Sequence, residues 1–136
     1  MWFSKKQAAA PTGQITTKRR GDAAEALACA YLTGQGLRLV EANFNTPGRG
    51  GGEIDLVMRA PDGTLVFVEV RQRSTASHGG AGGSITHTKQ RRIIFAARHY
   101  LMRFAHSPPC RFDVVLVQGP EGQQTIEWLQ AAFDAS

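Results

Sequence analysis

The 136-residue sequence has little cysteine and no long apolar run. Its two cysteines, Cys29 and Cys110, are too few for a disulfide framework and lack zinc-ligand spacing, so we expect two reduced thiols. No apolar stretch approaches the length of a membrane span. The basic N-terminus has no apolar segment long enough for a signal peptide. We therefore expect a cytoplasmic protein that does not insert into a membrane.

Acidic residues are also few. Eleven Asp and Glu stand against sixteen Lys and Arg, which gives a formal net charge of +5. This balance favours an anionic partner, of which nucleic acid is the commonest. The four histidines have no zinc-ligand spacing, and the glycine-rich segment 48–52 lacks the Lys-Ser/Thr ending of a P-loop. Neither a zinc site nor a P-loop nucleotide site is expected.

The apolar pattern predicts one domain, residues 18–136, that follows a disordered basic tail, residues 1–17. Helices are predicted over about 17–35 and 86–104. Strands are predicted over 37–45, 111–118 and 125–129, a hairpin within 50–73, and flexible segments at 48–52 and 74–84. The order α-β-β-β-α-β-β predicts an α/β fold, with one mixed sheet and helices packed against it.

The turn of the hairpin determines which residues face one another. Pro61-Asp62-Gly63 is typical of a three-residue loop that ends with glycine in the left-handed conformation. Counting back along both strands places Val57 opposite Phe67 and Asp55 opposite Glu69. Strand side chains alternate, so one face should carry the charged residues Glu53, Asp55, Glu69, Arg71 and Arg73. The other face should be core and carry Ile54, Leu56, Val66, Val68 and Val70.

Asp55 and Glu69 would be like charges at directly opposed positions. Their Cβ atoms would lie about 4.5–5.5 Å apart, where like charges repel. A divalent cation would relieve the repulsion, and Mg²⁺ is typically held by one or two carboxylates together with water. Glu25, on the first predicted helix, is placed to reach such a site. The alternative is a solvated hairpin face on which Glu53 pairs with Arg71, but the opposed acids favour the metal site.

Five segments of the chain resemble, in order and spacing, the bacterial YraN-like family: "GDAAEALACAYLTGQGLRLVEANFN", "GGEIDLV", "VFVEVRQR", "KQRRIIFAARHYL" and "RFDVV". That family is a branch of the PD-(D/E)xK nuclease superfamily and is similar to archaeal Holliday-junction resolvases. The resemblance covers about residues 18–133. It implies a restriction-endonuclease-like fold, in which helices flank a central mixed β-sheet, and hydrolysis of DNA with Mg²⁺ or Mn²⁺.

The resemblance also assigns the site. The helix glutamate corresponds to Glu25, the strand aspartate to Asp55 and the glutamate of the E-x-K motif to Glu69. It implies that Asp55, Glu69 and the backbone carbonyl of Val70 hold the metal. Arg71 stands where these nucleases have a lysine that orients or deprotonates the attacking water.

Arg71 departs from the family pattern. Its guanidinium stays protonated and cannot act as a base, although it can hold a scissile phosphate. Loss of a general base typically slows a reaction by about 10²–10⁴-fold, which predicts a slow nuclease or none. Lys89 is an alternative source of the lysine, but we interpret it as a solvated helix residue. As a set, Arg73, Lys89, Arg91 and Arg92 are expected to contact DNA phosphates.

These observations support two functions. The leading hypothesis is a structure-selective, metal-dependent endonuclease that cleaves branched or single-stranded DNA. The alternative is a catalytically inactive module of the same fold that binds DNA or another protein. Arg71 favours the inactive module, whereas the three acidic residues favour the enzyme. We expect Asp113 to be a structural partner of Arg111, and the oligomeric state is left open, a dimer included.

Overall fold

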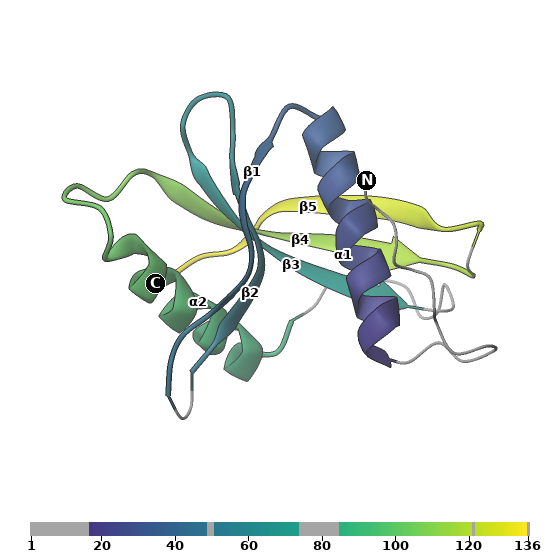
Figure 1. Cartoon of the computed structure of the whole chain (residues 1–136), viewed down its shortest axis with the longest axis horizontal. Coiled ribbons are helices and arrows are strands. Elements are labelled where there is room, and N and C mark those ends of the chain that lie inside the picture. Colours follow the sequence, from purple (N-terminus) through teal and green to yellow (C-terminus); the bar gives the residue numbers. More distant parts are fainter. Residues whose placement is uncertain (1–16, 49–50, 74–84, 121, 136) are drawn as a thin grey trace, which may run out of the picture.

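The computed structural model describes residues 17–48, 51–73, 85–120 and 122–135 (Figure 1). Its elements are α1 (Thr17–Gly34), β1 (Arg38–Asn45), β2 (Glu53–Arg59), β3 (Leu65–Arg73), α2 (His87–Leu101), β4 (Cys110–Gln118) and β5 (Thr125–Phe133). The predicted element order is confirmed, and β5 is longer than predicted. The predicted tail up to residue 16 and the predicted loop 74–84 lie outside the described residues.

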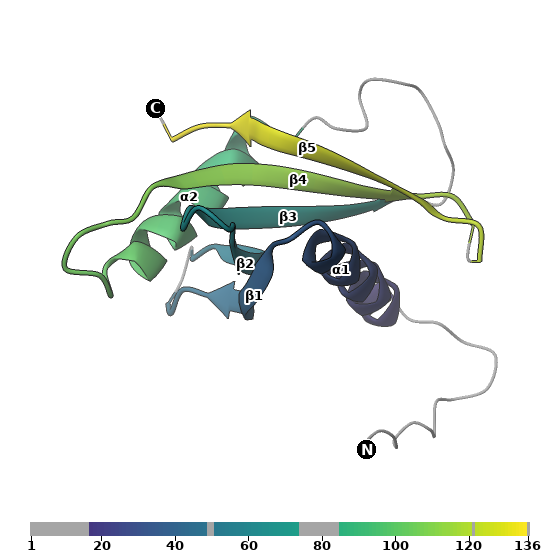
Figure 2. The same ribbon diagram turned by 90° about the horizontal axis from the view of Figure 1, so that it is seen from above.

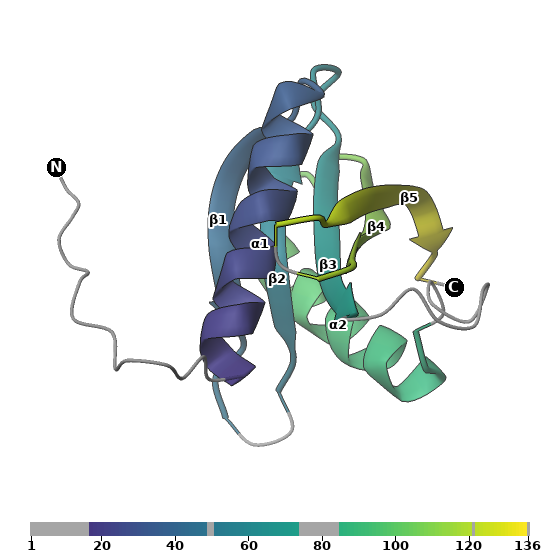
Figure 3. The ribbon, with the colours of Figure 1, turned by 90° about the vertical axis from the view of Figure 1, so that its right-hand side faces the viewer.

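The five strands form one sheet in the order β1-β2-β3-β4-β5, which Figure 3 shows from edge to edge. Neighbouring strands are antiparallel except for β3 and β4, which are parallel. Parallel neighbours need a long connection, and α2 lies within it. β1 and β2 cross the other three strands at a steep angle (Figure 1). The predicted α/β fold is therefore confirmed, and a mixed sheet flanked by two helices is consistent with a restriction-endonuclease-like fold.

The two helices pack on opposite faces of the sheet, and Figure 2 shows them on either side of β2. Alternation along β3 explains this arrangement. Val66 and Val68 belong to the apolar cluster that includes α1, whereas Leu65 and Phe67 belong to the cluster that includes α2. Both faces of the hairpin are therefore core, including the face of Phe67 that also carries Glu69.

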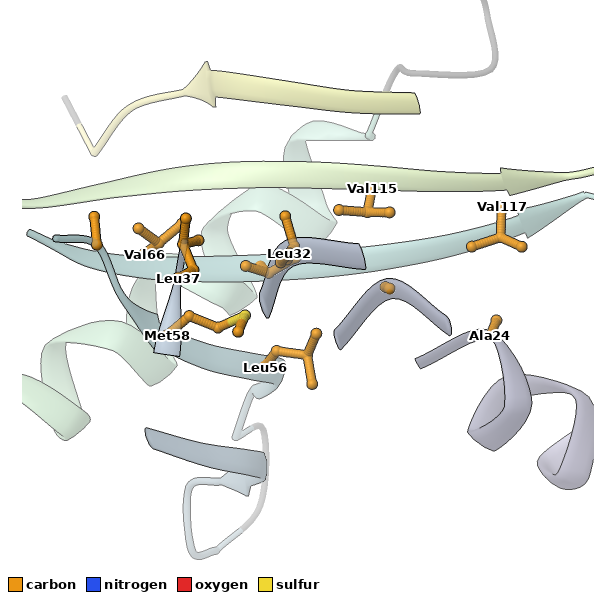
Figure 4. Close-up of a cluster of buried hydrophobic side chains, with 11 residues drawn as sticks. Ala24, Leu32, Leu37, Leu56, Met58, Val66, Val115 and Val117 are labelled. Atoms are coloured by element: carbon orange, nitrogen blue, oxygen red, sulfur yellow. The ribbon is translucent and has the colours of Figure 1, made fainter. Parts of the chain in front are cut away.

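The α1 side of the core is drawn in Figure 4. The helix contributes Ala24 and Leu32, which are almost completely buried. They pack against side chains from β2, β3 and β4, among them Leu56, Met58, Val66, Val115 and Val117. Residues 112–117 of β4 are all buried, as their continuous apolar pattern predicts for a strand covered on both faces.

The predicted hairpin turn is confirmed. The Ala60 amide donates to the Thr64 carbonyl at 2.8 Å, and Gly63 adopts a φ of 94°. Val57 pairs with Phe67, which is the predicted register. Only the positive φ of the third loop residue requires glycine, because other residues adopt that conformation at a steric cost.

One predicted face is wrong at the start of β2. Ile54 was expected beside Leu56, yet it packs with Phe67 in the cluster on the α2 side. A neighbouring residue of β1, Asn43, has a left-handed φ of 56°. The register pairs Ala42 with Leu56 and Phe44 with Ile54, so Asn43 lies opposite Asp55, at the point where β2 changes face between Ile54 and Leu56.

The segment 48–52 was predicted to be a flexible connection, and its last residue is a packing position instead. A Cβ atom on Gly52 would overlap the backbone carbonyl oxygen of Arg92 in α2. Thr46 closes the connection, because its amide donates to the Gly52 carbonyl at 3.0 Å and its hydroxyl accepts from the Gly52 amide at 2.7 Å. Gly52 therefore fixes the distance between α2 and the start of β2.

Asp113 is completely buried within β4. Its carboxylate accepts hydrogen bonds from Arg111 Nε at 3.1 Å, Trp128 Nε1 at 2.8 Å and the Ala131 amide at 2.9 Å. The predicted partnership with Arg111 is confirmed, and the same carboxylate also fastens β5 to the sheet. A buried carboxylate needs such partners because it has lost its hydration.

Two negative expectations can be compared with the described residues. Cys29 and Cys110 are both free thiols, as predicted. Within the described ranges, neither α1 nor α2 has the combination of length and apolar character that would let it cross a membrane.

Candidate functional site

The candidate site lies where β2 and β3 stop pairing. The last paired residues at this end are Leu56 and Val68. One step further, the Asp55 side chain takes the place of the β2 backbone, because its Oδ2 accepts a hydrogen bond from the Val70 amide at 2.8 Å. The predicted register thus brings Asp55 close to Glu69. The two residues are not a backbone pair of the ladder, because the pairing of β2 with β3 ends at Leu56 and Val68, and they meet through their side chains.

Asp55 is the central carboxylate of three. Its side chain is within hydrogen-bonding reach of Glu25 and of Glu69. Glu25 comes from α1, whereas Glu69 is on the α2 face of β3. Asp55 lies between Ile54 and Leu56, where β2 changes face, and is therefore placed between α1 on one side and the α2 face of β3 on the other. The three acids predicted from the sequence therefore converge in the structure.

The electrostatics of Glu69 are those of an acid that lacks a sufficient counter-charge. Glu69 is only 8% exposed, and its burial together with the charge of Asp55 raises its pKa to about 8. The Lys89 ammonium lowers that pKa, but its effect is smaller than that of burial or of Asp55. Glu69 therefore favours its protonated form unless another cation approaches.

Glu25 behaves in the same way. Its pKa is raised to about 7, chiefly by burial and then by the charge of Asp55, with smaller contributions from Asp22 and Glu53. Acidic residues thus surround Glu25 on several sides. A row of carboxylates that repel one another is a place where a bound cation gains the most favourable energy.

Lys89 contacts this cluster, while its side chain stays partly solvated on the helix. Its Nζ lies 3.6 Å from Glu69 Oε2, with the lysine side chain 44% exposed. The position follows from the helix cap: the Thr86 hydroxyl accepts from the Lys89 amide at 3.1 Å and so starts α2 beside β3. Lys89 thereby brings an amine from α2 to the glutamate of the E-x-K motif.

The other predicted residues are placed around this cluster. Arg71 is half-buried, and its side chain makes no hydrogen bond or ion pair with any described residue; the predicted pairing with Glu53 does not form. Arg73 is half-buried too, and its Nε has no partner in the described ranges. Arg91 and Arg92 are exposed on α2, where Arg92 donates to the Gly51 carbonyl at 3.4 Å.

The residues present were compared with the requirements of a divalent cation. In the described part of the chain, no three acidic, histidine or cysteine side chains are grouped so that together they could hold a metal ion. Two carboxylates, of Asp55 and Glu69, and the carbonyl of Val70 remain as donors. N–H and C=O of a strand residue point to the same side, and the Val70 amide points at Asp55. This oxygen donor set fits Mg²⁺ or Mn²⁺, which commonly keep water ligands.

Two residues with clear local roles, Thr86 and Gly52, and one exposed aromatic residue, Phe95, were not among the predicted site residues. Thr86 is a recognisable N-cap signal, three residues before Lys89. Gly52 carries no sequence signal of its close contact with α2, because the contact exists only in the folded chain. Phe95 lies four residues after Arg91 and three before Arg98, a basic and aromatic spacing that is readable on a helix.

Comparison with known proteins adds the family. Uncharacterised protein family UPF0102 matches residues 24–117, a span that includes all the residues of the acidic cluster and Lys89. A UPF0102 protein of Polaromonas naphthalenivorans is 69% identical over the whole of both chains. Another, of Paracidovorax citrulli, is 56% identical over 99% of each chain. A third, of Albidiferax ferrireducens, is 67% identical over 88% of this chain and 91% of its own. The chain therefore belongs to the UPF0102 family, as its YraN-like resemblance predicts.

Proposed function

We propose that this protein is a metal-dependent endonuclease that hydrolyses phosphodiester bonds in DNA. The observation that carries the proposal is the convergence of Glu25, Asp55 and Glu69 with the amine of Lys89 at the open end of the β2–β3 ladder. The resemblance to PD-(D/E)xK nucleases supports the same reading. A partly buried acidic cluster in which two pKa values are raised is typical of functional sites rather than of ordinary surfaces.

The roles of the residues follow from their chemistry. Asp55, Glu69 and the Val70 carbonyl would hold Mg²⁺ or Mn²⁺, which activates water and offsets charge on the phosphate when bound. Lys89 and Arg71 are the two cations at the motif, and they position the scissile phosphate. Glu25 orients either a water molecule or the side chain of Asp55, which it contacts from α1.

DNA is the favoured substrate because of charge. The chain carries a net charge of +5, and α2, which begins at the site, contains Lys89, Arg91, Arg92 and Arg98 but no acidic residue. Phosphate contacts of this kind supply affinity without reading sequence. Selectivity for branched or single-stranded DNA, and action in the cytoplasm, belong to the same proposal and rest on the resemblance to Holliday-junction resolvases.

A second function is favoured by one residue. Arg71 stands at the lysine position and cannot accept a proton from water. A chain that has lost the reaction would keep the fold and the basic helix, and would act as a DNA-binding module. The contact between Lys89 and Glu69 is the observation that favours the enzyme over this module, because it supplies an amine at the same motif.

A cleavage assay distinguishes the two functions. Wild-type protein is incubated with a labelled four-way junction, single-stranded DNA and duplex, with Mg²⁺, Mn²⁺ or EDTA. The matched variants are Asp55→Asn, which removes the central charge but keeps an oxygen acceptor for the Val70 amide, and Glu53→Gln, which neutralises an exposed acid two residues away. Cleavage should require the metal, disappear in Asp55→Asn and persist in Glu53→Gln. Absence of cleavage by wild type on every substrate would favour the binding module.

Metal binding is measured separately by thermal unfolding. A ligand that binds only the folded state stabilises it, by about 2.7 kcal/mol at a concentration of 100 Kd. Mn²⁺ should therefore raise the melting temperature of wild type and Glu53→Gln by several degrees, but not that of Asp55→Asn. An equal increase in all three proteins would place the metal outside the acidic cluster.

A further inference from the structure

The outer face of α2, defined by Arg91, Phe95, Arg98 and Met102, points away from the core. These residues follow one another at intervals of four, three and four, so they form one stripe along the helix. All four are exposed, Phe95 by 44% and Met102 by 76%. The opposite side of α2 contains the buried residues Ile93, Ala96, Ala97 and Tyr100.

Phe95 differs from most aromatic residues of the chain. Phe67 and Phe112 stack on each other in the core, and Tyr100 packs edge-on against Phe67. Among the described residues, the only aromatic ring that Phe95 contacts is that of His99 on the same helix, with ring centroids 4.9 Å apart. A large part of the Phe95 ring is therefore exposed to solvent. Arg91 lies about one helical turn before it and Arg98 about one turn after it.

We propose that the outer face of α2 binds an unpaired segment of DNA, with a base stacked on Phe95 and the flanking phosphates held by Arg91 and Arg98. The inference rests on the proposed function, in that DNA is taken as the ligand of this chain. Proteins that bind single strands combine these two features, aromatic side chains for the bases and positive charges for the backbone. A duplex offers only the second interaction, because its base faces are already stacked.

The charge of the helix favours this ligand over an apolar protein partner. α2 has four lysine or arginine residues and no acid. An apolar partner surface would have to desolvate Arg91 and Arg98, which lie on either side of Phe95, and unpaired buried charges are costly. A polyanion gains from the same charges.

The position of the stripe connects it with the acidic cluster. Lys89 contacts Glu69, and Phe95 follows six residues later on the same helix. At 1.5 Å per residue, the two Cα atoms are separated by about 9 Å along the helix axis. Around the axis, six residues correspond to about 240°, so Lys89 faces β3 while Phe95 faces outward. A strand held on the outer face of α2 would therefore pass over the helix to reach the site, and the stripe would select DNA that has an unpaired segment next to the bond to be cleaved.

The test measures the DNA affinity of the full-length chain in EDTA. EDTA removes divalent metal ions, so DNA can be bound but not cleaved. Fluorescence anisotropy is recorded with labelled single-stranded DNA and with duplex of the same length, at several salt concentrations. Phe95→Ala should weaken single-strand binding by at least about fivefold and leave duplex binding nearly unchanged. Phe95→Trp should restore it, because a tryptophan ring also stacks.

Two further variants separate stacking from other effects. Met102→Ala removes a more exposed apolar side chain from the same stripe and should leave both affinities unchanged. Arg98→Gln should weaken the binding of both single strands and duplex. It should also reduce the slope of log affinity against log salt concentration for single strands by about 0.7, whereas Phe95→Ala should leave that slope unchanged. The melting temperature of each variant reports whether the helix has remained folded.

The inference is overturned if Phe95→Ala binds single-stranded DNA as tightly as wild type, or if its affinity for duplex falls by the same factor. It is equally overturned if Met102→Ala weakens single-strand binding as much as Phe95→Ala does. It is also overturned if wild type binds no single-stranded DNA. Failure of the proposed function gives a different result: Phe95-dependent binding without any metal-dependent cleavage. If cleavage depends on Asp55 but single-strand binding does not depend on Phe95, the proposed nuclease function stands and the proposed binding role of the stripe is wrong.

Discussion

The Lys89 ammonium lies 3.6 Å from Glu69 Oε2, although the two residues come from different elements. In an E-x-K motif the amine is carried two residues after the glutamate, on the same strand, and here that position is Arg71. The site therefore has a guanidinium from β3 and an ammonium from α2. The two cations differ, because a guanidinium is a rigid planar fork and an ammonium is a compact point charge.

Lys89→Gln should lower metal-dependent DNA cleavage by roughly 10²–10³-fold, which is typical for removal of one positioned charge or donor at a reacting group. Unfolding free energy should change little, because the ion pair is partly exposed. Rates are measured under single-turnover conditions. Arg103→Gln is the control: it removes a cation that pairs with Glu41 beyond the other end of α2. Equal losses of cleavage rate in both variants would mean that the rate depends on the total positive charge of the protein and not on the position of Lys89.

The role of Arg71 can be tested against that variant. Arg71→Lys alone should change cleavage little, because Lys89 already provides an amine at Glu69. In the Lys89→Gln background, however, Arg71→Lys should restore much of the lost rate, since it returns an ammonium two residues after the glutamate. Restoration is read from single-turnover rates. A double variant as slow as Lys89→Gln would show that the two positions are not equivalent.

The hairpin could be predicted because its determinants are local. The left-handed Gly63 and the two-residue alternation of β3 fix the pairing of Val57 with Phe67, and counting from that pair brings Asp55 to Glu69. The convergence of these acids follows from one turn and one register. The order of the elements was equally predictable from apolar periodicity.

The partner of Glu69 on α2 could not be predicted, because no local rule relates the start of α2 to β3. That relation depends on the crossover between two parallel strands and on the close contact of Gly52 with Arg92. The face of Ile54 was predicted wrongly for a similar reason. Strict alternation was assumed, but β2 changes face between Ile54 and Leu56, opposite the left-handed Asn43.

Gly52→Ala should destabilise the protein by about 1–3 kcal/mol or more, because a Cβ there overlaps the Arg92 carbonyl and α2 must move away. Gly21→Ala in α1 is the matched control. No heavy atom lies within 4 Å of its added Cβ, so alanine should be neutral or stabilising in the helix. Chemical unfolding gives both values. If Gly52→Ala were as stable as Gly21→Ala, the contact would not hold α2 in place.

The pH dependence of stability should reveal the acidic cluster in metal-free protein. Glu69 has a pKa of about 8 in the folded chain and an ordinary value of 4.5. Its raised folded pKa means that the protonated form adds stability below pH 4.5, and that this stability is lost as the pH rises towards 8. Glu25, with a pKa of about 7, acts in the same direction and more weakly, since it is more exposed.

Unfolding in urea with EDTA is therefore expected to become easier from pH 5 to pH 8, by up to about 1.4 kcal/mol per pH unit for Glu69. Glu69→Gln removes that titration but leaves that of Glu25, so its stability should fall less over the same range. Saturating Mn²⁺ should oppose the fall in wild type, because a cation favours the ionised carboxylates. Parallel pH profiles for wild type and Glu69→Gln would contradict the repulsion between Glu69 and Asp55 on which the metal site depends.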